Sequence, residues 1–172
     1  MNKKKYTIAQ ILPALNTGGV ERGVVEISKA LVDNNFKSIV ISSGGYMVSQ
    51  ITRNGGIHYD LDVHTKNPLK WPKIRSDLKK ILEIENVDLI HFCSRAPAWI
   101  GVPLGAILDI PIITSVHMRF RKSNIFKKYY NSILTKGNSI IAISKHVEES
   151  IKISFPKVSG KIKIIHRGVD LD

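Results

Sequence analysis

Short, almost wholly apolar runs recur along this chain, and each interval between them is long enough to hold a helix. The runs cover residues 8–12, 38–41, 87–92, 110–116, 139–143 and 161–165, with a weaker one at 57–61. Strands buried on both faces read as continuous apolar segments, and strands that alternate with helices pair in parallel. The sequence therefore predicts an α/β fold, a single domain with a mainly parallel sheet and helices on both faces.

The first of these units contains a glycine turn. After the run at 8–12 come Gly18 and Gly19, and apolar residues then recur on one helical face: Val20, Val24, Ile27 and Leu31. Adjacent glycines let bare N–H groups approach a ligand, and the start of a helix favours an anion. The spacing matches neither the dinucleotide fingerprint nor the P-loop. Spacing alone therefore supports a phosphate site and a purely geometric turn equally.

The carboxyl ends of the strands indicate where a ligand would bind. In an open parallel sheet, ligands bind beyond those ends, at the point where the strand order reverses. With a strand order of 3-2-1-4-5, the glycine turn would lie beside Ser94 and Arg95, with His117 one strand away. The segments expected at this edge are 16–20, 94–97, 117–121, 144–145 and 166–170.

Composition excludes several classes of protein. The 172 residues are 43% hydrophobic and 23% charged, which is ordinary for one globular domain. A single cysteine, Cys93, excludes an internal disulfide and a cysteine-based zinc cluster, and it suits a reducing cytosol. We find neither a signal peptide nor an apolar run near the roughly 20 residues that a membrane-spanning helix needs.

The net charge of +12 is the one unusual value, and it points to acidic partners: nucleotide phosphates, anionic lipid or nucleic acid. Residues 119–136 hold six basic and no acidic side chains, interleaved with aromatic residues at helical steps. Such a helix can pack on the sheet, present a solvated basic face, or lie on anionic lipid. We favour association with a membrane surface because the whole chain is basic.

Five stretches, in order along nearly the whole chain, resemble the family 4 glycosyltransferases, which are retaining enzymes of the two-domain GT-B type. They are Pro13–Arg22 with the sequence PALNTGGVER, the segment 87–99 with SRAPAW, Thr114–His117, the segment 140–144 with IIAIS, and Arg167–Asp170 with RGVD. Each stretch alone is a weak signal, and the five together are specific. The resemblance implies a Rossmann-like domain that forms the amino-terminal half of a GT-B fold.

The resemblance also implies a function. Such enzymes transfer a sugar from a nucleotide-sugar, here a UDP- or GDP-sugar, to an acceptor such as lipopolysaccharide, capsule polysaccharide or a glycolipid. They often need no metal and hold no prosthetic group. Residues 1–165 would form the acceptor-side domain and 166–172 the start of a linker, while the Glu-x7-Glu donor region has no counterpart here. We expect the chain alone to be inactive and to require a second domain or polypeptide. The expected location is cytoplasmic, peripheral on the inner face of the plasma membrane.

Site residues carry over from the resemblance position by position. His117 is the expected catalytic residue, although Met118 stands where the family usually has glycine. Contacts with the donor phosphates or the acceptor are expected from these residues: Gly18, Gly19, Ser94, Arg95, Arg119, Ser144 and Arg167. Arg95 could equally form a salt bridge to a local acid. His91 is more typical of a hydrogen-bonded core histidine, and no pair of carboxylates converges as two-acid hydrolysis requires.

Two other classes remain open from the sequence. The high pI of about 9.9 fits a nucleic-acid-binding module, although the basic residues are dispersed and no zinc-finger or RNP-like pattern occurs. The third class is a partner-binding module without catalysis.

Overall fold

One seven-stranded sheet organises the molecule. The computed structural model describes residues 5–65, 67–120, 124–166 and 168. The strands are β1 (Thr7–Ile11), β2 (Lys37–Ser42), β3 (Ile57–Asp60), β4 (Leu89–Phe92), β5 (Ile112–Val116), β6 (Ser139–Ala142) and β7 (Ile162–Ile164). All pair in parallel, in the order β3-β2-β1-β4-β5-β6-β7. The predicted α/β fold is confirmed, and so is the strand order on which the predicted site depends.

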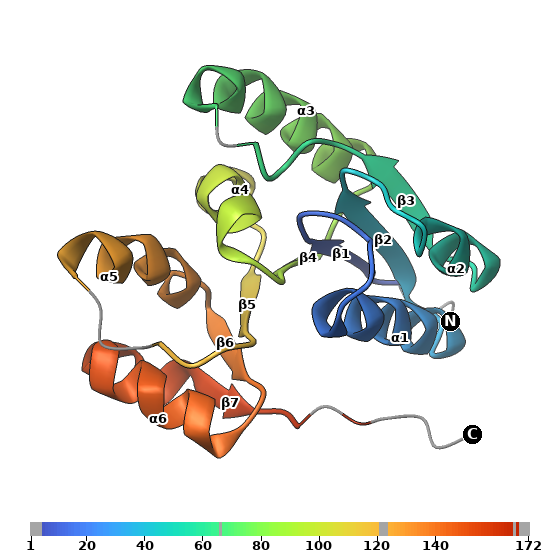
Figure 1. Cartoon of the computed structure of the whole chain (residues 1–172). Coiled ribbons are helices and arrows are strands. Elements are labelled where there is room, and N and C mark those ends of the chain that lie inside the picture. Colours follow the sequence, from blue (N-terminus) through green and yellow to red (C-terminus); the bar gives the residue numbers. More distant parts are fainter. Residues whose placement is uncertain (1–4, 66, 121–123, 167, 169–172) are drawn as a thin grey trace.

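The helices divide between the two faces of the sheet (Figure 1). They are α1 (Gly19–Asp33), α2 (Val48–Arg53), α3 (Trp71–Ile84), α4 (Arg95–Leu108), α5 (Ile125–Ser132) and α6 (Lys145–Ser154). Figure 1 shows α1 and α2 on one side of the sheet and α3 to α6 on the other. Crossovers between parallel strands are right-handed. Because β2 and β3 are added on one side of β1 and β4 to β7 on the other, the helices of the two halves lie on opposite faces of the sheet.

Two apolar clusters hold these layers together. The larger lies between the sheet and helices α3, α4 and α6, and it includes Phe92, Leu78, Leu104 and Ile151. The smaller lies under α1 and α2, and it includes Leu12, Leu15, Val24, Val40 and Ile51. Alternation along β2 explains this division, because Ile39 and Ile41 belong to the larger cluster and Val40 to the smaller.

The helix in the basic segment 119–136 changes character near its end. It is α-helical to Ser132 and then continues as the 3₁₀ turn η2 (Ile133–Thr135). Ile133, Leu134 and Thr135 are buried, and the Thr135 hydroxyl donates to the Ser132 carbonyl at 2.7 Å. The tighter turn brings these side chains into the core before Gly137 leads into β6.

Candidate functional site

The strand order reverses between β1 and β4, and a helix starts just beyond the carboxyl end of each. In register, Gln10 lies opposite His91 and Ile11 opposite Phe92. Gly18 is the N-cap of α1, and Ser94 is the N-cap of α4. The predicted neighbours therefore do follow two adjacent strands, at the edge where ligands bind in such sheets.

The glycine turn at the start of α1 is crowded by an acid. Gly18 has extended backbone (φ 171°, ψ 164°), which any residue can adopt, so conformation is not why glycine stands there. A Cβ at Gly18 would instead collide with the carboxylate of Glu21, which lies in the first turn of α1. The Glu21 carboxylate thus lies at the positive end of the helix, and a bound phosphate would have to displace it.

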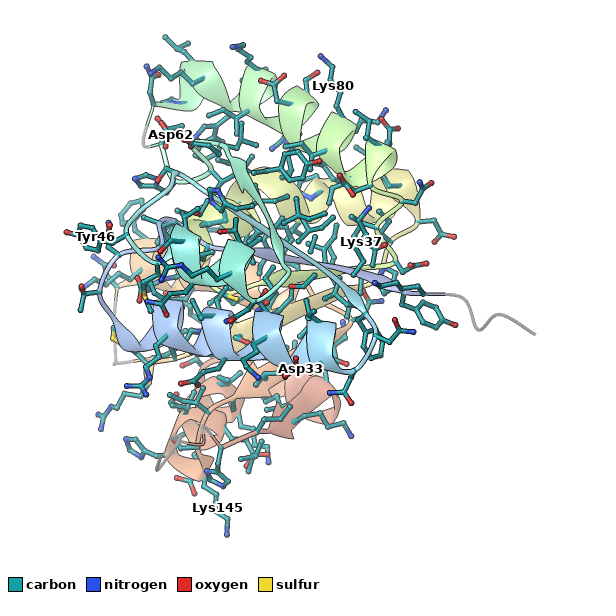
Figure 2. All side chains as sticks on the ribbon, turned by 90° about the vertical axis from the view of Figure 1, so that its right-hand side faces the viewer. Asp33, Lys37, Tyr46, Asp62, Lys80 and Lys145 are labelled. Atoms are coloured by element: carbon teal, nitrogen blue, oxygen red, sulfur yellow. The ribbon has the colours of Figure 1, made fainter. Side chains whose placement is uncertain are left out.

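The loop 43–47, which follows β2, braces the segment that leads from β1 into the glycine turn. The backbone N–H of Leu15 donates to Gly44 O at 2.7 Å, and that of Met47 donates to Leu15 O at 3.0 Å. The Ser43 hydroxyl donates to Pro13 O at 2.7 Å. In Figure 2 this loop projects at the edge marked by the exposed Tyr46, while Lys37, at the amino end of β2, lies toward the other edge.

Gly45 is the residue that this brace requires. Its φ of +131° favours glycine, and a Cβ there would come within 2.4 Å of the Leu15 carbonyl oxygen. Two loops that approach so closely fix the course of the chain into α1. The glycine turn is therefore a braced feature of the carboxyl edge.

A groove of about 310 Å³ lies between α1 and strands β4 to β6. Its lining from α1 is Val20, Gly23, Val24, Glu26 and Ile27; from the strands and the segments after them it is His91, Cys93, Ser115, His117, Ile141, Ile143, Ile165, His166 and Gly168. The walls are mainly apolar, and the polar groups include three histidines. The groove thus brings the predicted catalytic His117 together with the first turns of α1.

The floor of the groove contains a buried polar cluster. His91 is 7% exposed, and its Nε2 lies 2.6 Å from the Ser115 hydroxyl. Burial lowers the pKa of His91 to about 4, so the ring is neutral at physiological pH. The Cys93 sulfur lies 3.8 Å from the same Nε2. The prediction that His91 is a hydrogen-bonded core histidine is confirmed, and a neutral imidazole here also faces the groove.

Arg95 is directed toward α5. Its Nη1 donates to Asn131 Oδ1 at 2.8 Å, and its guanidinium lies 5.5 Å from the centre of the Tyr130 ring. The expected alternatives for this side chain were a phosphate and a carboxylate. The structure shows an amide oxygen and an aromatic face, because α4 and α5 pack side by side on the face opposite α1.

The other expected site residues are spread along the same edge. Arg119 Nη1 lies 3.2 Å from His146 Nε2 on α6, and the Ser144 hydroxyl caps that helix by accepting from Val147 N at 3.2 Å. Arg167 lies outside the described residues. Within the described chain, His117 is the expected site residue that lines the groove.

Sequence reasoning did not assign a role to His166 or Ser115. His166 follows the last strand, and its place in the series of carboxyl-end segments was the available signal. Ser115 lies inside β5, where alternation alone cannot show that it faces His91 across the strand pair. Both residues line the same groove as His117.

A parallel sheet with a braced glycine turn at its reversal defines a Rossmann-like domain. A family model described as Glycosyltransferase Family 4 matches residues 17–172. The chain belongs to this family, in which it corresponds to the amino-terminal domain of a GT-B enzyme.

Solved structures agree with this assignment. A glycosyltransferase from Rickettsia africae ESF-5 is 36% identical, with a TM-score of 0.84 over 98% of this chain and 44% of that one. Anabaena Alr3699/HepE in complex with UDP and glucose is 14% identical, with a TM-score of 0.77 over 95% of this chain and 45% of that one. The lipopolysaccharide outer core galactosyltransferase WaaB is 14% identical, with a TM-score of 0.73 over 96% and 47%. This chain thus spans less than half the length of each, and the last two show the fold alone.

No curated protein gives a significant match. Among the described residues, none of the helices has the length and apolar character needed to cross a bilayer.

Proposed function

We propose that this chain is the acceptor-side domain of a retaining glycosyltransferase that uses a UDP- or GDP-sugar. Its acceptor is a lipopolysaccharide, a capsule polysaccharide or another glycolipid. The observation that carries the proposal is the groove at the carboxyl edge, where His117 and His166 meet the first turns of α1. The complex of HepE with UDP and glucose supports the donor class, and the activity named for WaaB supports the acceptor class.

His117 is the residue best placed to act on the sugar. It follows β5 directly and stands at the edge where ligands bind in such sheets. An imidazole can donate or accept a hydrogen bond, and it can stabilise charge that develops as the bond from the sugar to the nucleotide breaks. The braced glycine turn would face the donor phosphates once the Glu21 carboxylate moves aside.

A second domain or polypeptide would supply the donor-binding half. This chain spans 44% of the Rickettsia africae enzyme, so half of the cleft would come from elsewhere. We therefore propose that the chain alone does not turn over, and that residues 166–172 begin the connection. The complete enzyme would work in the cytoplasm, peripheral on the inner face of the plasma membrane.

The test is a chimera that joins this chain to the remaining part of the Rickettsia africae glycosyltransferase. We expect release of UDP or GDP from a panel of nucleotide-sugars in the presence of lipopolysaccharide or glycolipid acceptors, and none from the chain alone. His117→Ala should lower kcat by about a hundredfold, as loss of one stabilising contact in a transition state does.

The matched control is Gln50→Ala, which changes an exposed residue of α2 away from the groove and should leave kcat unchanged. A normal kcat for His117→Ala would remove His117 from the reaction. A chimera that folds but releases no nucleotide from any donor would contradict the proposed activity.

A further inference from the structure

The loop that follows β3 carries two titratable side chains that the proposed function does not use, Asp62 and His64. Between them, Val63 is fully buried in the larger apolar cluster, and the backbone N–H of Leu61 donates to Ser42 O at 2.9 Å. These contacts fix the backbone of the loop. The side chains of Asp62 and His64, which are 48% and 46% exposed, therefore stand on its outer side at a defined position.

The Asp62 and His64 side chains reach the brace through Ser43. His64 Nδ1 lies 3.1 Å from Asp62 Oδ1 and 3.3 Å from Ser43 Oγ. The Ser43 hydroxyl in turn donates to Pro13 O at 2.7 Å. Figure 2 shows Asp62 toward the same edge of the molecule as Tyr46. A line of polar contacts therefore runs from the loop after β3 to the segment that enters the glycine turn.

The protons in this line of contacts follow from its chemistry. A serine hydroxyl has one proton, and Ser43 gives it to Pro13 O, because a carbonyl oxygen only accepts. The Ser43 oxygen must then accept from His64, and the Asp62 carboxylate accepts as well. Nδ1 of His64 therefore carries a proton. A neutral His64 ring has the Nδ1–H form with Nε2 unprotonated, and a protonated ring keeps the same Nδ1–H.

The Nδ1–H group of His64 controls where the Ser43 hydroxyl points. A hydroxyl rotates about its C–O bond until its proton meets an acceptor. Because His64 directs Nδ1–H at the Ser43 oxygen, it offers no lone pair to the hydroxyl proton, and that proton goes to Pro13 O. Without the Nδ1–H donor, the hydroxyl would be free to turn away from Pro13.

We infer that His64, oriented by Asp62, is a positioning residue for the glycine turn. It acts through Ser43, whose hydroxyl bond to Pro13 O reinforces the backbone bonds of the brace. The inference rests on the proposed function in one respect, since that function places the donor phosphates at the glycine turn. Loss of the Nδ1–H donor should therefore shift the turn and weaken binding of the nucleotide-sugar.

Hydrogen exchange of the chain, followed by NMR, is the first test. The reporters are three backbone N–H groups that donate within the brace, those of Leu15, Ser43 and Met47. In His64→Gln these amides should exchange about threefold faster, which is the scale of one hydrogen bond between neutral groups. In His64→Asn they should exchange as in the wild type, because the Asn side-chain nitrogen takes the place of Nδ1, whereas that of Gln takes the place of Nε2.

The tautomer of His64 is the second test, and it separates a positioning role from a merely structural one. Free histidine prefers the Nε2–H form when it is neutral, so the Nδ1–H form requires specific acceptors. The ¹⁵N shifts of the His64 ring at alkaline pH should show the proton on Nδ1. In the double variant Ser43→Ala, Asp62→Ala, which removes both acceptors, the proton should return to Nε2. A proton on Nε2 in the wild type would overturn the inference.

Ser159→Ala is the matched control for the brace. The Ser159 hydroxyl also donates to a proline carbonyl, Pro156 O, at 2.7 Å, but both residues lie in the 3₁₀ turn η3 (Pro156–Lys161). This variant should leave the brace amides and the His64 tautomer unchanged. Since His64 is exposed, its own variants should fold as the wild type does, which urea denaturation checks. Equal exchange of the brace amides in His64→Gln and the wild type would overturn the inference.

The chimera with the Rickettsia africae enzyme measures the effect on the reaction. His64→Gln should raise the KM for the nucleotide-sugar about threefold with kcat unchanged, and His64→Asn should restore it. Faster exchange in His64→Gln without a change in KM would overturn the positioning role. The exchange and tautomer measurements need no nucleotide-sugar, so their failure is distinct from failure of the chimera to transfer sugar.

Discussion

Gln10 lies at the centre of the sheet, fully buried, with its amide facing the α1 side. Its register partners are Val40 and His91. Within the described part of the chain, neither its Nε2 nor its Oε1 has a hydrogen-bond partner. Burial of an unsatisfied amide lowers stability by about 1–3 kcal/mol.

We therefore expect Gln10→Met, which keeps the volume and removes the amide, to raise the free energy of unfolding by about 1 kcal/mol. Urea denaturation measures this. Gln50→Met on the exposed face of α2 is the control and should change stability by less than about 0.5 kcal/mol. A large loss of stability in Gln10→Met would show that the amide is satisfied in solution.

At the scale of elements, the brace between the β1–α1 and β2–α2 connections carries a prediction. Gly45→Ala combines an unfavourable backbone angle with a clash against Leu15, so we expect a loss of about 1–3 kcal/mol in thermal unfolding. The chimera carrying this change should also lose transferase activity at temperatures where it remains folded, because the glycine turn shifts.

Gly160→Ala is the matched control for the brace. A Cβ at Gly160 would meet no heavy atom within 4 Å, so the substitution should be close to neutral. If both variants unfolded at the same temperature, the brace would not stabilise the turn.

The elements were predictable where local signals agree. The apolar runs located every strand, and in the structure the Ser144 hydroxyl caps the start of α6. The site was less predictable, because its geometry depends on which side chains meet between elements. Arg95 looks suited to a phosphate in sequence, yet Asn131, 36 residues away, accepts its hydrogen bond. Likewise, helical periodicity left Phe126 open to a packing face, a solvated face or a lipid surface, and in the structure that side chain is 82% exposed.

For the whole molecule, histidine burial predicts weaker stability in mild acid. The folded state holds the pKa of His91 near 4, below the ordinary 6.5, so the unfolded chain binds more protons between those values. The stabilising contribution is fully present above pH 6.5 and is lost as the pH falls toward 4. At pH 5 the loss from His91 is about 2 kcal/mol relative to pH 7.5.

Urea denaturation at pH 7.5 and pH 5 checks this expectation. Burial also lowers the pKa of His58, although Asp60 opposes that shift, so His58 adds to the loss in the same direction. His91→Gln should flatten most of the pH dependence and His58→Gln a smaller part. An unaltered pH dependence in both variants would assign the effect to other groups.

The central position of β1 has a consequence for synthesis on the ribosome. β1 is made first, yet one of its two partners is β4, and the backbone of Thr7 is bonded to a side chain 81 residues later, that of Asp88. The nascent chain can form β1, β2 and β3 with α1 and α2, but one side of β1 then stays unpaired until β4 emerges. An open strand edge of this kind can recruit other nascent chains. Slow translation between residues 60 and 92 would therefore favour aggregation over folding, and chaperone capture would be strongest on nascent chains of that length.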